Sequence, residues 1–264
     1  MVVAIDAFRR YFEAHADKYV LIGGAACDLL FTKAGLDYRA TKDLDIVLCV
    51  EVVDAAFAQT FADFLDAAGY QERAVYDEER KFYRFEKPTD AAFPHMIELF
   101  ARTSAAVDLP EGDRYLRLTV EDAILSLSAL LLDADYYPLI ESGRQLIEGV
   151  SILGPDILIP FKARAFLDLS DRKAKGEQVD SDDIKKHRND VFRLVQLLPT
   201  TGELVLPDAI KEDLRRFIEA VKSVSADPKS FGVPLTKDEG MEILNRFYAL
   251  SQQEGAEGPE DQDG

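Results

Sequence analysis

Apolar and polar positions follow two spacings through the first hundred residues. Apolar side chains recur every three or four positions in residues 5–16 and 53–68, which predicts two amphipathic helices, and a third helix is predicted to begin at Ala25. Short runs of β-favouring residues lie between these segments and predict strands at 19–22, 43–50, 72–76, 80–86 and 95–100. This order, α-β-α-β-α-β-β-β, is typical of a mixed sheet with helices packed against it.

The pattern becomes helical later in the chain. Helices are predicted at 120–133, 156–174, 182–198, 207–223 and 236–251. Pro110 and Gly112 lie beside acidic residues in the loop 103–118, so we place a boundary between two lobes there. The predicted domains are an α/β domain over 1–105, a helical lobe over 106–253 and an acidic tail over 254–264 that we expect to be disordered.

The composition indicates a folded body and narrows the class of partner. Hydrophobic residues make up 47% of the 264 residues and charged residues 30%, far from the profile of a disordered chain. The net charge of −18 argues against broad non-specific binding to nucleic acid, because such binding depends on Lys and Arg neutralising phosphates. Small molecules or proteins are therefore favoured as partners.

The sequence also predicts a cytoplasmic protein. No apolar run approaches the roughly 20 residues of a membrane span, and the first residues carry charges where a signal peptide needs an apolar stretch. Cys27 and Cys49 lie in apolar segments without the spacing of a zinc site or a disulfide framework, which favours small core residues in a reducing compartment.

Three acidic residues in predicted strands form a candidate metal site. Asp43 and Asp45 enter the strand 43–50, and because successive side chains of a strand alternate, both project to one side with Cα atoms roughly 6.5–7 Å apart. Two such carboxylates repel each other unless they are protonated or bridged by a cation, and Mg²⁺ prefers oxygen ligands. Glu98 lies in the middle of the apolar strand 95–100 and completes the site if the two strands are neighbours.

Gly23 and Gly24 join the strand 19–22 to the following helix. Glycines let the backbone approach a phosphate closely, and the helix start offers N–H groups and the positive end of a dipole. A tight strand-to-helix turn is the alternative interpretation. The acids have structural alternatives too, since Asp at a strand start is commonly a turn residue and a salt bridge to Arg39 or Arg102 would account for Glu98.

The order strand, Gly-Gly, helix, polar loop and Asp-x-Asp resembles the signature of the nucleotidyltransferase superfamily. Residues 20–26 and 39–48 carry this resemblance. Within the superfamily the pattern is similar to that of the AbiEii-type branch, which includes toxins of bacterial toxin–antitoxin pairs. That branch shows an Arg, then Ser or Thr, then Asp-x-Asp, and the matching residues here are Arg39, Thr41, Asp43 and Asp45. The resemblance implies an α/β fold with a nucleotidyltransferase-like mixed sheet, flanking helices and a C-terminal helical lobe.

Two stretches of the predicted helical lobe, 161–166 and 186–194, also resemble this branch. There a Lys opens one helix and a Lys-x-x-x-Asp-like stretch follows on the next. The resemblance implies that Lys162 contacts nucleotide phosphates and that Asp190 orients Lys162 or a substrate group. From the residues alone, a lone Lys at this place in an amphipathic helix is more typical of a solvated flank.

Two departures from the family pattern leave alternatives open. Gly24 stands where many active members carry Ser, which would weaken triphosphate binding. The connection from Lys162 to Asp190 is long, so Asp182 or Asp183 could serve in place of Asp190.

Residues 185–188 form a basic cluster in an acidic chain. Such a run is usually an exposed face, but near an acidic metal site it would steer a triphosphate towards the metal. His187 within this cluster is a candidate general base, with an ordinary surface position as the alternative.

The predicted function is metal-dependent transfer of a nucleoside monophosphate from an NTP to a hydroxyl acceptor, which is a tRNA, a protein or a small molecule. The implied metal is Mg²⁺ or Mn²⁺, held by Asp43, Asp45 and Glu98, with Glu98 as third ligand or base. The candidate catalytic residues are Asp43, Asp45, Glu98, Lys162 and Asp190, and the candidate nucleotide-binding residues are Gly23, Gly24, Arg39, Thr41 and Lys162.

The resemblance also implies a role as the toxin of a toxin–antitoxin pair, with an antitoxin protein as partner. The first alternative is a catalytically silent interaction module with the same fold, which Gly24 favours and which retention of the three acids disfavours. A structural α/β protein with its acids in salt bridges is the second alternative.

Overall fold

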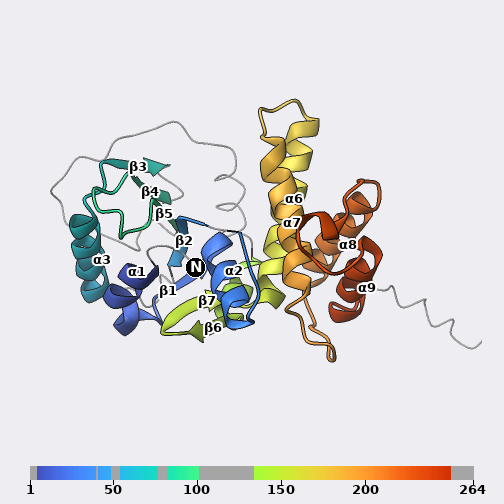
Figure 1. Cartoon of the computed structure of the whole chain (residues 1–264), viewed down its shortest axis with the longest axis horizontal. Coiled ribbons are helices and arrows are strands. Elements are labelled where there is room, and N and C mark those ends of the chain that lie inside the picture. Colours follow the sequence, from blue (N-terminus) through green and yellow to red (C-terminus); the bar gives the residue numbers. More distant parts are fainter. Residues whose placement is uncertain (1–4, 40, 49–53, 77–81, 101–133, 251–264) are drawn as a thin grey trace, which may run out of the picture.

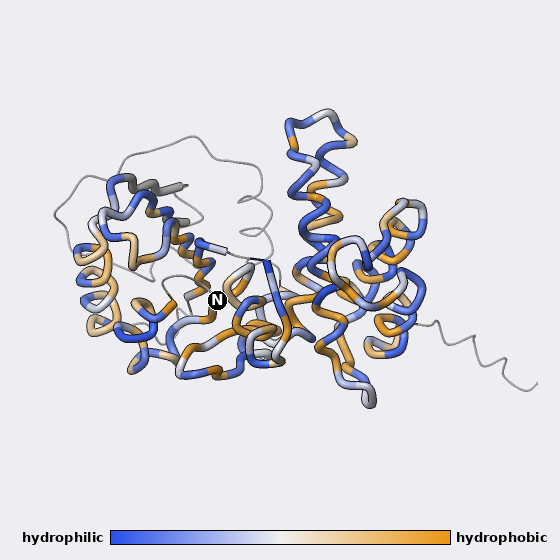
Figure 2. The backbone as a smooth tube through the Cα atoms, viewed as in Figure 1, coloured by the Kyte–Doolittle hydropathy of each residue, from blue (hydrophilic) through white to orange (hydrophobic). Residues whose placement is uncertain are grey.

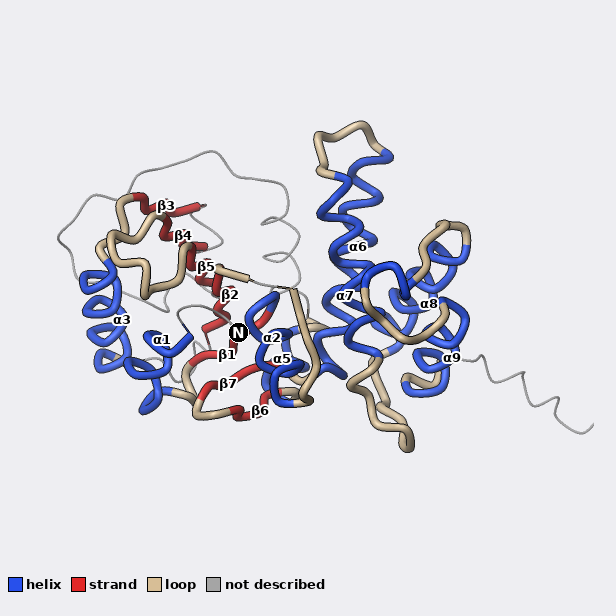
Figure 3. Tube along the Cα trace, viewed as in Figure 1, coloured by secondary structure: helices blue, strands red, loops and turns tan. Residues whose placement is uncertain are grey.

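The computed structural model describes residues 5–39, 41–48, 54–76, 82–100 and 134–250. The predicted helix 120–133, the boundary loop 103–118, the acidic tail 254–264 and Cys49 lie outside the described residues. Strands gather in one half of the molecule and the later helices in the other (Figures 1 and 3).

The described strands form one sheet of seven, in the order β3-β4-β5-β2-β1-β7-β6. Their bounds are β1 Tyr19–Ile22, β2 Asp43–Leu48, β3 Glu72–Tyr76, β4 Phe82–Glu86, β5 Met96–Phe100, β6 Arg144–Ile147 and β7 Val150–Leu153. The sheet is mixed, because β1 runs antiparallel to β2 and parallel to β7, while β2 runs parallel to β5. The predicted mixed α/β fold is confirmed.

The apolar sequences of the strands β1 and β7 agree with their burial in the sheet. Every residue of β1 and of β7 is buried, as expected for strands covered on both faces. In β2 the buried side chains include Leu44 and Ile46, whereas Asp43 and Asp45 are partly exposed. The buried apolar side chains of β2 therefore hold the strand in the core. Asp43 and Asp45, at the start of the strand, line a cavity described below.

Three helices accompany the first strands: α1 (Ile5–Phe12, continued by a 3-10 turn at Glu13–His15), α2 (Gly23–Lys33) and α3 (Ala55–Ala68). Edge-on and tilted aromatic rings join α1 to α3, with ring centroids of Phe12 and Phe64 5.3 Å apart. Asp54 caps α3 by accepting a hydrogen bond from the Phe57 N–H at 2.9 Å, and Gly69 ends it at a φ of +63°. The sequence predicted this stop.

After β7 the described chain is helical, and four of its helices match predicted ones; we refer to these four helices as the helical lobe. They are α6 (Pro155–Ala174), α7 (Ser181–Val195), α8 (Asp208–Lys222) and α9 (Lys237–Phe247), with a 3-10 turn at Pro228–Phe231. The outer turns of the α6–α7 hairpin are mostly hydrophilic (Figure 2). Within the part of the chain that the structure describes, no helix is both long enough and apolar enough to cross a bilayer.

The structure differs from the sequence prediction between residues 134 and 154. A short helix, α5 (Tyr137–Ser142), precedes the hairpin of β6 and β7, and the sequence predicted none of these elements. Glu148 and Gly149 turn the hairpin with φ angles of +48° and +79°. Because β7 pairs with β1, the sheet takes strands from both sides of the predicted lobe boundary.

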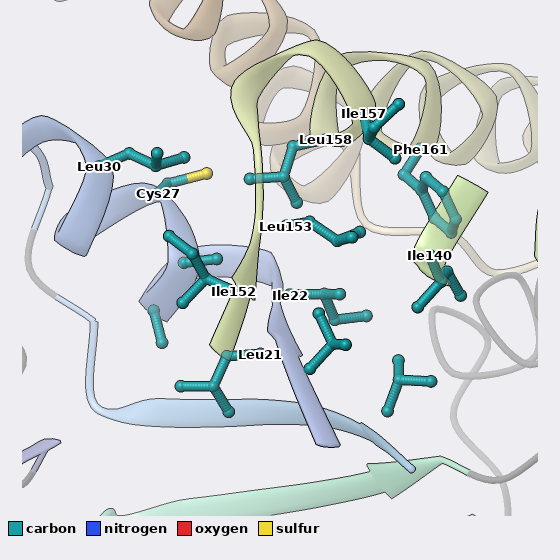
Figure 4. Packing of buried hydrophobic residues seen from close by; sticks show 14 of the residues in the cluster. Leu21, Ile22, Cys27, Leu30, Ile140, Ile152, Leu153, Ile157, Leu158 and Phe161 are labelled. Carbon is teal, nitrogen blue, oxygen red and sulfur yellow. The ribbon is translucent and has the colours of Figure 1, made fainter. Parts of the chain in front are cut away.

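This hairpin also fixes the helical lobe against the sheet. Gly154 is the residue between β7 and α6, so the first turns of α6 begin at the sheet. Ile157, Leu158 and Phe161 of α6 belong to the same apolar core as residues of β1, β7 and α2 (Figure 4). The start of α6 is thereby held at the sheet, and α6 contacts α2.

Candidate active site

A cavity of about 600 Å³ lies where the sheet, the start of α2 and the helices α6 and α7 meet. Its volume falls within the range of small-molecule sites, roughly 300–1,000 Å³. The predicted site residues that line it are Gly23, Gly24, Arg39, Thr41, Asp43, Asp45, Glu98 and Lys162. Asp190 does not line the cavity, and it lies behind Lys162, as described below.

The acidic wall of the cavity comes from the neighbouring parallel strands β2 and β5. Asp45 stands opposite Glu98 in the register, and Asp43 stands opposite Met96. Burial first and then the Asp45 carboxylate raise the pKa of Asp43 above its usual range. The same two causes raise the pKa of Glu98, which also shares a hydrogen bond with Asp45. Without a cation, ionisation of all three acids together is therefore unfavourable, and Asp43 and Glu98 hold their protons more tightly than free carboxyl groups do.

Glu98 is paired with a base that the sequence did not single out. Arg84 on β4 donates to Glu98 Oε1 from Nη2 at 2.8 Å and from Nε at 3.2 Å. The salt-bridge alternative for Glu98 thus has a partner, but that partner is Arg84, one strand away, rather than Arg39. No signal in the sequence identified it, because the pairing depends on the register of β4 with β5.

The donor set determines what kind of cation the cavity suits. Among the described residues, no three His, Cys, Asp or Glu side chains are placed to share one metal ion. Asp43 and Asp45 remain as a pair of carboxylates on one side of a strand, and Mg²⁺ is commonly held by one or two carboxylates together with substrate phosphates. The residues present fit a divalent ion that completes its shell from a phosphate-bearing ligand.

Gly23 and Gly24 are placed against the residues of this wall. Gly23 has a left-handed φ of +67°, and a Cβ there would overlap Oδ2 of Asp45. A Cβ on Gly24 would lie 3.0 Å from Thr41 Oγ1 and 3.6 Å from an Arg39 nitrogen. A side chain at position 24 would therefore require Thr41 to move by a few tenths of an ångström.

Gly23→Ala tests this packing. We expect it to cost about 1–3 kcal/mol of stability through the left-handed backbone and to displace Asp45, so that metal-dependent nucleotide binding is lost. Gly35→Ala is the matched control, since Gly35 also has a positive φ, +70°, but open space around its Cβ. Chemical denaturation and nucleotide titration would separate the two variants. Unchanged nucleotide affinity in Gly23→Ala would contradict the role given to Gly23.

The basic wall is built on a buried carboxylate. Asp190 on α7 is completely buried, and its oxygens lie 3.3 Å from Lys162 Nζ, 3.2 Å from Arg39 Nη2 and 3.1 Å from Arg193 Nη1. Burial acts to raise the pKa of Asp190, but Lys162 and Arg39 hold it well below its usual range. The carboxylate is therefore ionised and fixes three cations from three segments of the chain.

This arrangement corrects two interpretations of the sequence. Lys162 is not a solvated flank, because its side chain is only 8% exposed and it points between Asp190 and the cavity. Asp182 does not contact Lys162, since it is 81% exposed and bound to Lys185 at 2.8 Å, whereas Asp183 lines the cavity. Asp190 is the carboxylate that holds Lys162.

His187 also lines the cavity, one turn of α7 before Asp190. Burial, and then the charge of Lys162, lower the pKa of His187 to about 3. The imidazole is therefore neutral near pH 7, which disfavours the general-base role considered from the sequence, because an efficient general base has a pKa near the working pH. His95 also lies on the cavity wall, 3.9 Å from Asp43.

Comparisons with known proteins give weak similarities. No family model and no curated protein matches the chain. An antigenic nucleotidyltransferase-like protein from Paracoccidioides brasiliensis aligns with a TM-score of 0.41 at 17% identity, over 85% of this chain and 93% of that one. The Megavirus polyadenylate synthase aligns with a TM-score of 0.40 at 13% identity, over 84% of this chain but only 36% of that one, so this chain spans about a third of that protein. Similarities at this level carry no argument about function, which is argued below from the cavity.

Proposed function

We propose that this chain is a metal-dependent nucleotidyltransferase, which moves a nucleoside monophosphate from an NTP to a hydroxyl acceptor and releases pyrophosphate. The observation that carries the proposal is one cavity in which the carboxylates of Asp43 and Asp45 stand on one wall and the ammonium of Lys162 on another. A ligand that suits both walls is a polyanion accompanied by a divalent cation. An NTP with its metal has this character.

The start of α2 provides the third element for binding phosphate. The helix begins at Gly23, and the residue before it, Ile22, provides no side-chain cap for the first N–H groups. Those groups, together with the positive end of the helix dipole, suit phosphate oxygens. The Thr41 hydroxyl and the Arg39 guanidinium lie beside Gly24 and add further donors.

Each protein group has a separate task in the proposed reaction. Asp43 and Asp45 would hold Mg²⁺ or Mn²⁺, which neutralises phosphate charge and lowers the pKa of the attacking hydroxyl. Lys162 neutralises developing charge on the phosphates, and Asp190 fixes its ammonium in place. Glu98, held by Arg84 and hydrogen-bonded to Asp45, keeps the Asp45 carboxylate in position.

The acceptor belongs to one of three classes: a tRNA, a protein or a small molecule. The net charge of −18 favours a small molecule or a protein, because it opposes the approach of RNA. A role as the toxin of a toxin–antitoxin pair, with an antitoxin as partner, is supported only by the resemblance of residues 39–48 to the AbiEii-type branch.

A labelling assay tests the activity and separates it from the catalytically silent alternative. The protein is incubated with each α-labelled NTP, MgCl₂ and a mixture of tRNA, cell proteins and aminoglycosides, and the label is followed into each fraction. We expect label in one fraction, pyrophosphate in solution, and neither in the presence of EDTA. Nucleotide binding without transfer to any fraction would favour the silent interaction module.

Lys162→Met tests the phosphate contact with little disturbance of the fold. Arg39 and Arg193 continue to neutralise Asp190, so the variant should fold. Loss of a charge-assisted contact should weaken binding of Mg²⁺-NTP about 10- to 100-fold in a calorimetric titration. Lys175→Met, an exposed site at the far end of α6, is the matched control. Equal affinity in the two variants would remove Lys162 from the nucleotide site.

A further inference from the structure

One face of α7 runs from the buried Asp190 along the wall of the cavity. Asp183, Lys186 and His187 line the cavity, and together with Asp190 they follow a spacing of three and four residues, which places them on one side of the helix. Asp190 holds Lys162, the proposed phosphate contact. At about 1.5 Å per residue, His187 lies roughly 4.5 Å along the axis from Asp190 and Asp183 roughly 10 Å. These distances are within the length of a nucleotide, so a nucleotide whose phosphates contact Lys162 can place its nucleoside against this face.

His187 has an unusual hydrogen-bonding state on that face. Its Nδ1 is shut off from solvent and has no hydrogen-bond partner among the described residues. A buried N–H without an acceptor is costly, so the proton is better placed on Nε2, where water or a ligand can accept it. Since His187 lines the cavity and Nδ1 is closed off, Nε2 is the nitrogen left to face the ligand.

We infer that His187 is a nucleoside-recognition residue, whose Nε2–H donates a hydrogen bond to an acceptor atom on the base or sugar of the bound nucleotide. The inference rests on the proposed function, because it takes the ligand to be a nucleotide. In this proposal the phosphates are bound by the neighbouring cations, mainly by Lys162, and not by His187. The low pKa of His187 agrees with this division, since a neutral donor suits an uncharged acceptor atom.

Two variants distinguish a hydrogen-bonding role of His187 Nε2–H from a purely structural role of the imidazole ring. His187→Phe keeps a flat ring but has no donor, and because Nδ1 is already unpartnered, the variant should fold with a melting temperature no lower than that of the wild type. His187→Gln places an amide nitrogen close to the position of Nε2 and retains the donor.

The experiment compares two ligands in MgCl₂ by calorimetry: the NTP that the wild type binds best and inorganic tripolyphosphate, which has no nucleoside. We expect His187→Phe to weaken NTP binding roughly tenfold while leaving tripolyphosphate binding unchanged. His187→Gln should recover most of the lost NTP affinity.

The outcomes that would overturn the inference differ from one another. An equal loss of affinity for both ligands in His187→Phe would make His187 a phosphate contact, and unchanged NTP affinity would remove it from the site. A His187→Gln variant as weak as His187→Phe would exclude the Nε2 donor. If the wild type bound tripolyphosphate but no NTP, or neither ligand, the proposed function would fail as well, and the wild-type titrations alone would show it.

Discussion

Replacing Asp190 with Asn is expected to destabilise the folded chain by about 3 kcal/mol and to abolish nucleotide binding. The amide cannot neutralise Lys162, Arg39 and Arg193, which converge on the buried carboxylate. The expected loss is at the lower end of the range for a broken buried ion pair, because the two arginines keep partial contact with solvent. Urea denaturation measures the stability, and titration with Mg²⁺-NTP measures the binding.

Asp182→Asn is the matched control on the same helix. Asp182 is 81% exposed and paired only with Lys185 among the described residues, so its replacement should change stability by no more than about 0.5 kcal/mol. If Asp190→Asn proved as stable as Asp182→Asn, the ion cluster would not hold the two helices and the loop together.

The pH dependence of stability follows from the same carboxylate. Because the pKa of Asp190 is lower in the folded chain than in the unfolded chain, its contribution is complete above the unfolded value, near 3.9, and is lost as the pH falls through the folded value. Asp43 and Glu98 have the opposite effect on the pH dependence of stability. Their pKa values are raised in the folded chain, so their ionisation at higher pH destabilises the fold. Asp190→Asn should therefore lose less stability on acidification below pH 4 than the wild type does.

Local patterns in the sequence predicted most of the fold because most elements carry their own signal. The helices α3 and α6 have clear helical spacing, and Gly69 marks the end of α3. The hairpin of β6 and β7 was missed because each strand has only four residues, too few to distinguish strand from helix spacing. Glu148 and Gly149 at its turn were the one local signal of a hairpin.

The candidate site was predictable where its residues are close in sequence. Asp43 and Asp45 share a side of β2 by the alternation of a strand alone. The pairing of Arg39 with Asp190 joins residues 151 positions apart, and the burial of Lys162 depends on the packing of α6 against α7, so neither follows from local spacing. Arg84 was missed for a similar reason, since only the register of β4 and β5 brings it to Glu98.

The largest effect on activity is expected from Asp45→Asn. The substitution removes one of the two carboxylates proposed to hold the metal and adds no bulk, so metal-dependent transfer should fall at least about 1,000-fold in the labelling assay. The remaining side-chain oxygen can still accept a hydrogen bond from Glu98, which favours an intact fold. A variant that retains Mg²⁺-dependent transfer would refute the assignment of Asp45.

The same substitution should stabilise the metal-free protein, which distinguishes a metal ligand from a structural acid. The Asp45 carboxylate disfavours ionisation of both Asp43 and Glu98, so removing its charge should raise the free energy of unfolding in EDTA by about 0.5–2 kcal/mol. Adding MgCl₂ should then stabilise the wild type but not Asp45→Asn, because only the wild type keeps both carboxylates. Asp63→Asn, on the exposed side of α3, is the control for removing a charge elsewhere and should respond to MgCl₂ as the wild type does. A lower stability of Asp45→Asn in EDTA would instead show that Asp45 serves the fold.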